Sequence, residues 1–284
     1  MALYVEDVRR TWEFDSSIDP PYFSEDRIHY DFTIILRIYL KQLNPPPGKN
    51  TFRAPDFDGM MWPALRWTRA AWLDFTSRYL KLVLKVWDKA FVLIPPAGYH
   101  GFVFPQGGRR RNLMCRLRLK LQDEPDKPHA AVQVVRLATP TQNGFRSDSG
   151  QYDSGDVKLK RVRYAPEGAS FLHNTPAHEV GHLLGLWDAG VGSQGCSANP
   201  HSSACYGSNL HERMNVMGGG GMLDLSNARP WLRRATVHVD STRESDWKVD
   251  WASSEAALRG LEGFQIDEKF KKPYQPPKPG LIDL

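Results

Sequence analysis

The chain has 284 residues, of which 41% are hydrophobic and 24% charged, a composition that fits a globular protein with an ample core. No stretch approaches twenty consecutive apolar residues, and the N-terminal segment lacks the apolar run of a Sec signal, so we expect neither a membrane span nor Sec export. The formal net charge is only +5, and the basic run at 109–111 lies between glycines and an asparagine, which favours a solvated loop over nucleic-acid binding.

Strand and helix patterns alternate through the first two thirds of the chain. Residues 30–41 place apolar side chains at every second position, as expected for a strand with one buried face. A long helical pattern follows from about Trp62 to Val86, and we expect its core-facing residues to include Leu65, Ala70, Leu73 and Leu80. Further strands are predicted at 91–95, 115–121, 131–137 and 157–164.

The remaining segments carry weaker patterns. The segment 145–156 holds three aspartates, but their spacing does not match a calcium-binding EF-hand loop, so a polar turn is favoured. Residues 225–239 are expected to be partly helical, with Ser226 as a candidate cap, and 246–264 to form another helix. The proline-rich segment 269–284 is expected to be extended or disordered.

The segment 178–188, HEVGHLLGLWD, is the most informative part of the sequence. On a helix, His178 and His182 are four residues apart and leave the same face, so both imidazoles can bind one metal ion, for which these ligands favour Zn²⁺. Glu179 can reach a water on that ion without being a ligand and act as general base. Gly185 can adopt a positive φ that ends the helix, which makes Asp188 a candidate third ligand.

The neighbouring residues support a helix at this place. Asn174 supplies an N-cap and Pro176 a first-turn proline, and the apolar residues between the histidines and after them form a stripe that can be buried. Without a metal, the two histidines would be a buried pair bonded to backbone, which leaves the spacing of the glycine and the aspartate unexplained. Three residues further along could replace Asp188 as third ligand: His201, His211 and Glu212.

The three cysteines divide into a pair and a single residue. Cys196 and Cys205 lie nine positions apart in a polar loop, a spacing that suits a local disulfide in an oxidising compartment. A second metal held by these thiols with His201 is disfavoured, because the usual C-x₂-C spacing is absent. Cys115 lies in an alternating run and is expected to be a small core residue.

The motif H-E-x-x-H-x-x-G-x-x-D at 178–188, followed by MNVMGGGG at 214–221, resembles the metzincin family of zinc peptidases. The resemblance implies an α+β, zincin-like catalytic domain with a twisted mixed sheet, a backing helix and an active-site helix, followed by a smaller irregular or helical C-terminal subdomain. It implies that Met217 lies in a turn beneath the metal. It also implies that an edge strand, 131–137 or 157–164, pairs with extended substrate. Asp188 departs from the commoner pattern, in which this ligand is histidine.

We therefore expect one domain over 1–268, with an upper sheet subdomain at about 28–187, a lower subdomain at about 188–268, and the segment 269–284 as a tail. With the cysteine-bearing loop and ARPW at 228–231, the chain also resembles metallopeptidase toxin domains that bacteria deliver by type VI secretion. That resemblance implies action in the periplasm of a target cell after non-Sec export; otherwise we expect a cytoplasmic protein. It implies a secretion carrier and an immunity protein as partners.

The expected substrate is a polypeptide or a cell-wall peptide. Two other functions fit the same residues. One is a peptidoglycan amidase or endopeptidase that uses the same zinc chemistry on wall crosslinks. The other is an inactive peptidase fold that serves as a binding module, against which the complete H-E-x-x-H argues.

Overall fold

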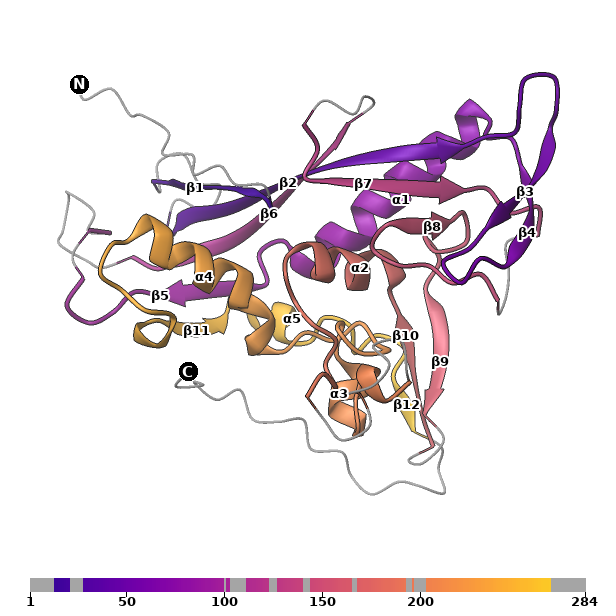
Figure 1. Ribbon diagram of the computed structural model, residues 1–284. Coiled ribbons are helices and arrows are strands. Elements are labelled where there is room, and N and C mark those ends of the chain that lie inside the picture. The colour runs from indigo at the N-terminus through magenta and orange to yellow at the C-terminus, as the bar shows by residue number, and fades with distance from the viewer. Residues whose placement is uncertain are drawn as a thin grey trace.

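The computed structural model describes residues 13–20, 28–99, 101–102, 111–122, 127–139, 144–164, 168–192, 196 and 203–266. The fold is α+β, with a seven-stranded mixed sheet at its centre (Figure 1). The strands of this sheet are β1 (Asp15–Asp19), β2 (Tyr30–Leu43), β5 (Phe91–Ile94), β6 (Leu113–Gln122), β7 (Ala130–Val135), β8 (Gln151–Asp153) and β11 (Lys248–Trp251). Their order is β11-β5-β6-β2-β7-β8, and β1 also pairs with β2.

Strand β2 lies in the middle of the main sheet and has three partner strands. It pairs in parallel with β6 and with β7, and antiparallel with β1. The alternation predicted for 30–41 is confirmed, because Phe32, Ile34, Leu36 and Ile38 are all fully buried. Cys115 lies opposite Phe32 in the β2–β6 register and is buried, as expected of a core residue.

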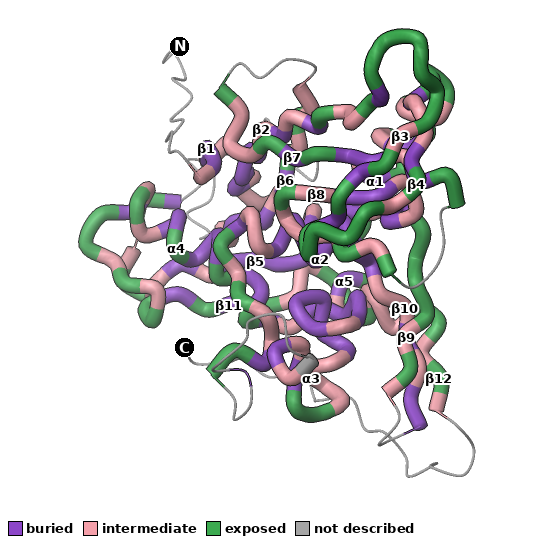
Figure 2. The backbone as a smooth tube through the Cα atoms, turned by 45° about the vertical axis from the view of Figure 1, so that its right-hand side comes forward, coloured by how far each residue is buried: buried purple, intermediate pink, exposed green. Residues whose placement is uncertain are grey.

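Three helices share one hydrophobic core with β2: α1 (Arg69–Trp87), α2 (Thr175–Leu183) and α4 (Arg229–His238). The hydrogen bond from the Trp231 indole to the Arg116 carbonyl, 3.0 Å, ties α4 to β6. Figure 2 shows buried backbone gathered along α2 and the central strands, with exposed and partly buried stretches at the outer loops. Two short helices, α3 (Leu210–Met214) and α5 (Ser254–Ala257), lie in the C-terminal third.

Helix α1 is a backing helix for α2. The indole N–H of Trp87 donates to the Ala177 carbonyl at 2.9 Å, and the amide of Asn174 donates to the Leu82 carbonyl at 3.2 Å. Trp87 is fully buried between the two helices and the sheet. These contacts fix the first turn of α2 against α1, and therefore against the main sheet.

A second sheet leads into α2. It consists of β9 (Lys160–Tyr164), β10 (Ala169–His173) and β12 (Gln265–Ile266), in the order β12-β10-β9. Of the two strands considered as open edges, β7 is enclosed between β2 and β8, whereas β9 pairs only with β10 among the described residues. The small hairpin of β3 (Thr51–Pro55) and β4 (Met61–Leu65) is a separate two-stranded sheet, which the antiparallel Ala64–Leu137 bridge joins to the segment just after β7.

The long helical pattern begins later than predicted. Residues Met61–Leu65 form strand β4, and α1 starts only after Thr68, whose hydroxyl accepts the Ala71 N–H at 3.2 Å. The predicted core face was also wrong in part, because Ala70 is exposed and Leu73 is 57% exposed. The helix is apolar on more than one side, and the face that packs on the sheet carries the larger side chains: Phe75, Tyr79, Val83, Val86 and Trp87.

Two C-terminal predictions were also wrong. Only Ser254–Ala257 is helical within 246–264, while Lys248–Trp251 is strand β11, because Trp247 and Val249 are buried in alternation with exposed neighbours. Residues 225–239 are helical as expected, but the cap of the first turn is the Asp224 carboxylate and not Ser226, whose N–H donates to it at 2.8 Å. The tail 269–284 lies outside the described residues. Within the described part of the chain, none of the helices has the length and apolar character needed to cross a membrane.

The α1–α2 junction yields a stability prediction. Replacing Trp87 by Phe removes the indole hydrogen bond and leaves a small void, so we expect the free energy of unfolding to fall by roughly 1–3 kcal/mol. The matched control is Trp187→Phe, because Trp187 is 74% exposed and its truncation should change little. Denaturant unfolding of both variants measures this difference, and an equal effect at the two positions would contradict the packing described.

Candidate metal centre

Helix α2 is held at both ends by local hydrogen bonds. The Asn174 side chain accepts the Ala177 N–H at 3.2 Å, with Pro176 in the first turn, as the sequence predicts. At the other end Gly185 has a φ of 85°, which glycine adopts without steric cost. The Gly185 N–H donates to the His182 carbonyl at 2.9 Å, and the Leu186 N–H to the Gly181 carbonyl at 3.0 Å. This Schellman arrangement ends the helix and reverses the chain toward Asp188.

Backbone carbonyls orient the two imidazoles. His178 Nδ1 lies 2.7 Å from the Val216 carbonyl, and His182 Nδ1 lies 3.0 Å from the Leu186 carbonyl. Since a carbonyl only accepts, each Nδ1 carries the proton and each Nε2 presents a lone pair. The two Nε2 atoms lie 3.2 Å apart, which is close enough for one metal ion to bind both.

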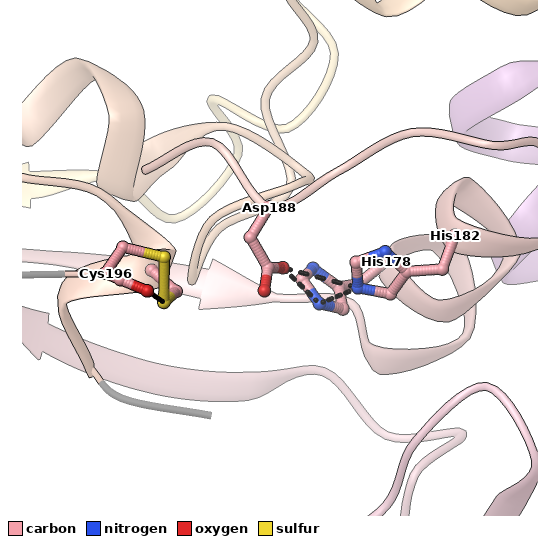
Figure 3. Close-up of a disulfide and its surroundings, with 5 residues drawn as sticks. His178, His182, Asp188 and Cys196 are labelled. Atoms are coloured by element: carbon pink, nitrogen blue, oxygen red, sulfur yellow. Dashed lines mark hydrogen bonds and ion pairs between the residues drawn. A yellow bond between two sulfur atoms is a disulfide. The ribbon is translucent and has the colours of Figure 1, made fainter. Parts of the chain in front are cut away.

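Asp188 completes a triangle of acceptor atoms with the two histidines (Figure 3). Its Oδ1 lies 3.4 Å from His178 Nε2 and 3.3 Å from His182 Nε2, and this oxygen is buried without a hydrogen-bond partner. Ligand atoms about 2.0–2.1 Å from a tetrahedral zinc ion lie roughly 3.3–3.4 Å apart. The spacing of the three atoms therefore fits a zinc ion, and their convergence in a buried place leaves a need for positive charge.

Burial and neighbouring charges shift the pKa values of both histidines. Burial, with the neighbouring His173 and His182, lowers the pKa of His178 to about 3, so this ring stays neutral. Burial also lowers the pKa of His182, but the contact with Asp188 and the Glu179 charge outweigh it and the pKa is raised.

Glu179 lies beside this triangle as a buried carboxyl group. It is 7% exposed, and one ligand atom from each of Glu179, His178 and His182 lies within 4.8 Å of the others. Burial raises the pKa of Glu179 to about 8, although the charge of His182 opposes the rise. No hydrogen bond to its carboxyl group is found among the described residues. Its position beside the site and its raised pKa suit a group that takes and releases protons.

Met217 packs directly beneath the helix that carries the histidines. It is 2% exposed, and a Cβ atom at Gly181 would collide with its sulfur. The absence of a side chain at Gly181, the residue before His182, is therefore what admits the thioether. Met217 is held in its turn by its N–H, which donates to the Asn215 side chain at 2.8 Å. The same turn supplies the Val216 carbonyl that orients His178.

The segment after Asp188 is tied to two other parts of the chain. The Ala189 N–H donates to the Met217 carbonyl and the Gly190 N–H to the Cys205 carbonyl, both at 2.8 Å. Cys205 forms a disulfide with Cys196, in agreement with the sequence-based pairing (Figure 3). Cys205 and the turn at 214–221, called the methionine turn below, therefore fix the backbone that follows Asp188.

A cavity of about 360 Å³ opens onto His178 and Glu179. Strand β9 forms one wall, and the loop at 145–148 and the methionine turn form others. Five aromatic residues line it, namely Phe57, Phe145, Tyr164, Phe171 and Tyr206. A volume of this size lies within the usual range for a small-ligand pocket and suits one or two residues of a substrate.

The other candidate ligands are engaged elsewhere or not described. His211 Nε2 lies 3.3 Å from the Asp224 carboxylate, and the Glu212 carboxylate accepts the N–H and the hydroxyl of Ser208 at 2.6 and 2.9 Å. His201 lies outside the described residues. The favoured polar turn at 145–156 is anchored by Asp156, which accepts hydrogen bonds from Ser147, Lys160 and the backbone N–H of Asp153.

Sequence reasoning missed several residues that surround the site. Tyr206 lies with its ring 5.7 Å from that of His178, and the His173 ring lies 5.5 Å from the same imidazole. Tyr206 and Arg213 come from the segment between the disulfide and the methionine turn, and neither belongs to a spaced motif. Only the fold, which brings that segment to α2, shows that they line the cavity.

Comparison of the chain with protein-family models, with curated proteins and with solved structures finds no match.

The buried carboxyl of Glu179 gives a pH-dependent prediction for the metal-free protein. Below about pH 4.5 the group is protonated in both states, while between there and about pH 8 only the unfolded chain releases the proton, so the free energy of unfolding falls as pH rises. Glu179→Gln removes this titration. We expect the variant to gain roughly 1–4 kcal/mol over the wild type between those pH values.

Denaturant unfolding in the presence of a chelator measures this gain. The exposed Glu262 provides the control, since Glu262→Gln should follow the wild type at every pH. If the free energy of unfolding changed with pH in the same way for Glu179→Gln and the wild type, the Glu179 carboxyl group would not be desolvated in the folded chain.

Proposed function

We propose that this chain is a zinc-dependent metallopeptidase with a metzincin-like centre. The observation that carries the proposal is the convergence of three acceptor atoms, from the buried His178 and the partly buried His182 and Asp188, at spacings of 3.2–3.4 Å. This triangle lies beside a buried carboxyl group and a cavity, which is the arrangement of a hydrolytic metal site with an open position.

Each of these residues has a role in amide hydrolysis. Zinc held by His178, His182 and Asp188 would polarise the scissile carbonyl and acidify water. Glu179 accepts the proton of the attacking water and delivers it to the leaving amine. Its pKa near 8 would fall beside a cation, so it can serve as a base at neutral pH. The carbonyls of Val216 and Leu186 keep the imidazoles in the required tautomer.

The edge of β9, which pairs only with β10 among the described residues, favours an extended polypeptide as substrate. Four of its five residues line the cavity: Lys160, Val162, Arg163 and Tyr164. An unpaired strand edge beside a catalytic centre can bind a peptide backbone by adding a strand to the sheet. Crosslinked wall peptides cannot lie along such an edge as readily, which is why we favour a peptidase over a peptidoglycan amidase or endopeptidase.

The metzincin assignment is supported by the residues beneath and after α2. Met217 packs under the helix at Gly181, and Asp188 follows the reversal at Gly185, as the resemblance implies. The Cys196–Cys205 disulfide is compatible with action in an oxidising place such as a periplasm. Delivery by type VI secretion, with a carrier and an immunity protein, stays a prediction from the resemblance to toxin domains.

The proposal is tested by separating metal binding from turnover. Glu179→Gln should retain about one zinc ion per chain but lose roughly 10²–10⁴-fold in cleavage rate, because the general base is removed while the ligands remain. His178→Ala should lose the zinc. Metal analysis of the purified proteins, together with digestion of casein and of purified sacculi, provides the readouts.

Two outcomes would contradict the proposal. Full turnover by Glu179→Gln would exclude its role as the base, and a wild-type chain that takes up no zinc would exclude the metal site. Degradation of sacculi but not casein would instead favour the cell-wall enzyme. Zinc uptake without cleavage of either would favour a binding module.

A further inference from the structure

Arg213 is a cation in the wall of the cavity, and no carboxylate of the described residues pairs with it. It lies on α3, directly before the methionine turn, and its side chain lines the same cavity as His178 and Glu179. Its Nε is buried without a hydrogen-bond partner, and among the described residues no acid pairs with its guanidinium group. Leaving such a group unpaired in a partly buried place is costly, which points to a partner that arrives with the substrate.

The other basic residues that line the cavity have interaction partners within the chain. Arg146 pairs with Asp58 at 2.9 Å, Lys160 pairs with the buried Asp156 at 2.6 Å, and Arg163 is engaged as well. The acidic residues of the lining are Asp148 and Glu179. Asp148 accepts the Gly150 N–H within its own turn, and Glu179 belongs to the candidate metal centre. Arg213 is thus the lining cation whose charge remains available to a ligand.

The position of Arg213 is fixed from two sides. Its guanidinium carbon lies 5.5 Å from the centre of the Tyr164 ring on β9, and the Tyr164 hydroxyl donates to the Ser208 carbonyl at 3.4 Å. Its backbone carbonyl accepts the Gly219 N–H at 2.9 Å, within the turn that holds Met217. A guanidinium group that packs on an aromatic ring, and whose backbone is anchored in a turn, can bind a carboxylate with little loss of freedom.

We infer that Arg213 forms a subsite for a carboxylate of the substrate, so that the enzyme cleaves peptides that carry an acidic group close to the scissile bond. This inference rests on the proposed peptidase function. The aromatic lining accommodates the aliphatic stem of the bound residue, and the guanidinium binds its charged end. The carboxylate belongs either to an Asp or Glu side chain or to the C-terminus of the substrate chain.

The cleavage profile tests this inference. The full-length, zinc-loaded chain digests a mixture of unfolded protein fragments, mass spectrometry identifies the new ends, and Glu179→Gln provides the blank. We expect Asp and Glu to be enriched at one position near the cut, or C-terminal residues to be removed in a way that amidation of the C-terminus blocks. A pair of synthetic peptides that differ only by Glu or Gln at that position then gives kcat and KM.

Substitutions at Arg213 assign the preference to this residue. Arg213→Gln should reduce the ratio of kcat/KM for the acidic peptide to kcat/KM for the neutral peptide roughly ten- to a hundredfold, because the charged contact is made with the acidic peptide alone. Arg213→Lys should retain part of the preference, and Arg213→Glu should shift it to Lys or Arg. Arg78→Gln, on the exposed side of α1 far along the chain, is the matched control and should behave as the wild type. Zinc content and unfolding midpoint confirm that each variant is folded.

The results distinguish the Arg213 subsite from the proposed peptidase function. Cleavage without an acidic preference, or a preference that survives in Arg213→Gln, would overturn the inference and leave the peptidase function standing. Absence of any cleavage above the Glu179→Gln blank would overturn the proposed function, and the subsite with it.

Discussion

The structure is organised around three acceptor atoms, on one buried and two partly buried side chains, that lie at van der Waals distance from one another. Two imidazole nitrogens and one carboxylate oxygen meet at 3.2–3.4 Å, although all three carry lone pairs and repel one another without a shared cation or proton. A chain that folds in this way needs a charge at that point. The contact with Asp188 raises the pKa of His182, and the same three atoms are the proposed ligands of the zinc ion.

Separate segments cooperate to hold the three atoms in place. Asn174 caps the start of α2, the reversal at Gly185 ends it, and the turn that carries Met217 provides the carbonyl that orients His178. The Cys196–Cys205 loop then binds the backbone just after Asp188. Because metal binding would stabilise the contacts of all these segments at once, zinc affinity and folding stability are expected to be coupled.

The sequence was most informative where short-range geometry decides the structure. The i, i+4 histidines, the N-cap at Asn174 and the positive φ of Gly185 follow from local rules, and the alternation in 30–41 directly reports the buried face of β2. Where several faces are apolar, as in α1, the pattern could not identify the side that packs, and Leu73 was misassigned. Arg213 and Tyr206 could not be found from sequence, because only the return of a distant loop to α2 places them in the cavity. β11 was missed because its four residues alternate for too short a stretch to outweigh the helical pattern around them.

X-ray absorption at the zinc edge of the zinc-loaded, full-length protein tests the central claim most directly. We expect a four-coordinate ion with two imidazole ligands and oxygen ligands at about 2.0–2.1 Å, and we expect His182→Ala, like His178→Ala, to lose this spectrum. A spectrum that shows sulfur ligands, or one that is unchanged in His182→Ala, would contradict a zinc ion held by His178, His182 and Asp188.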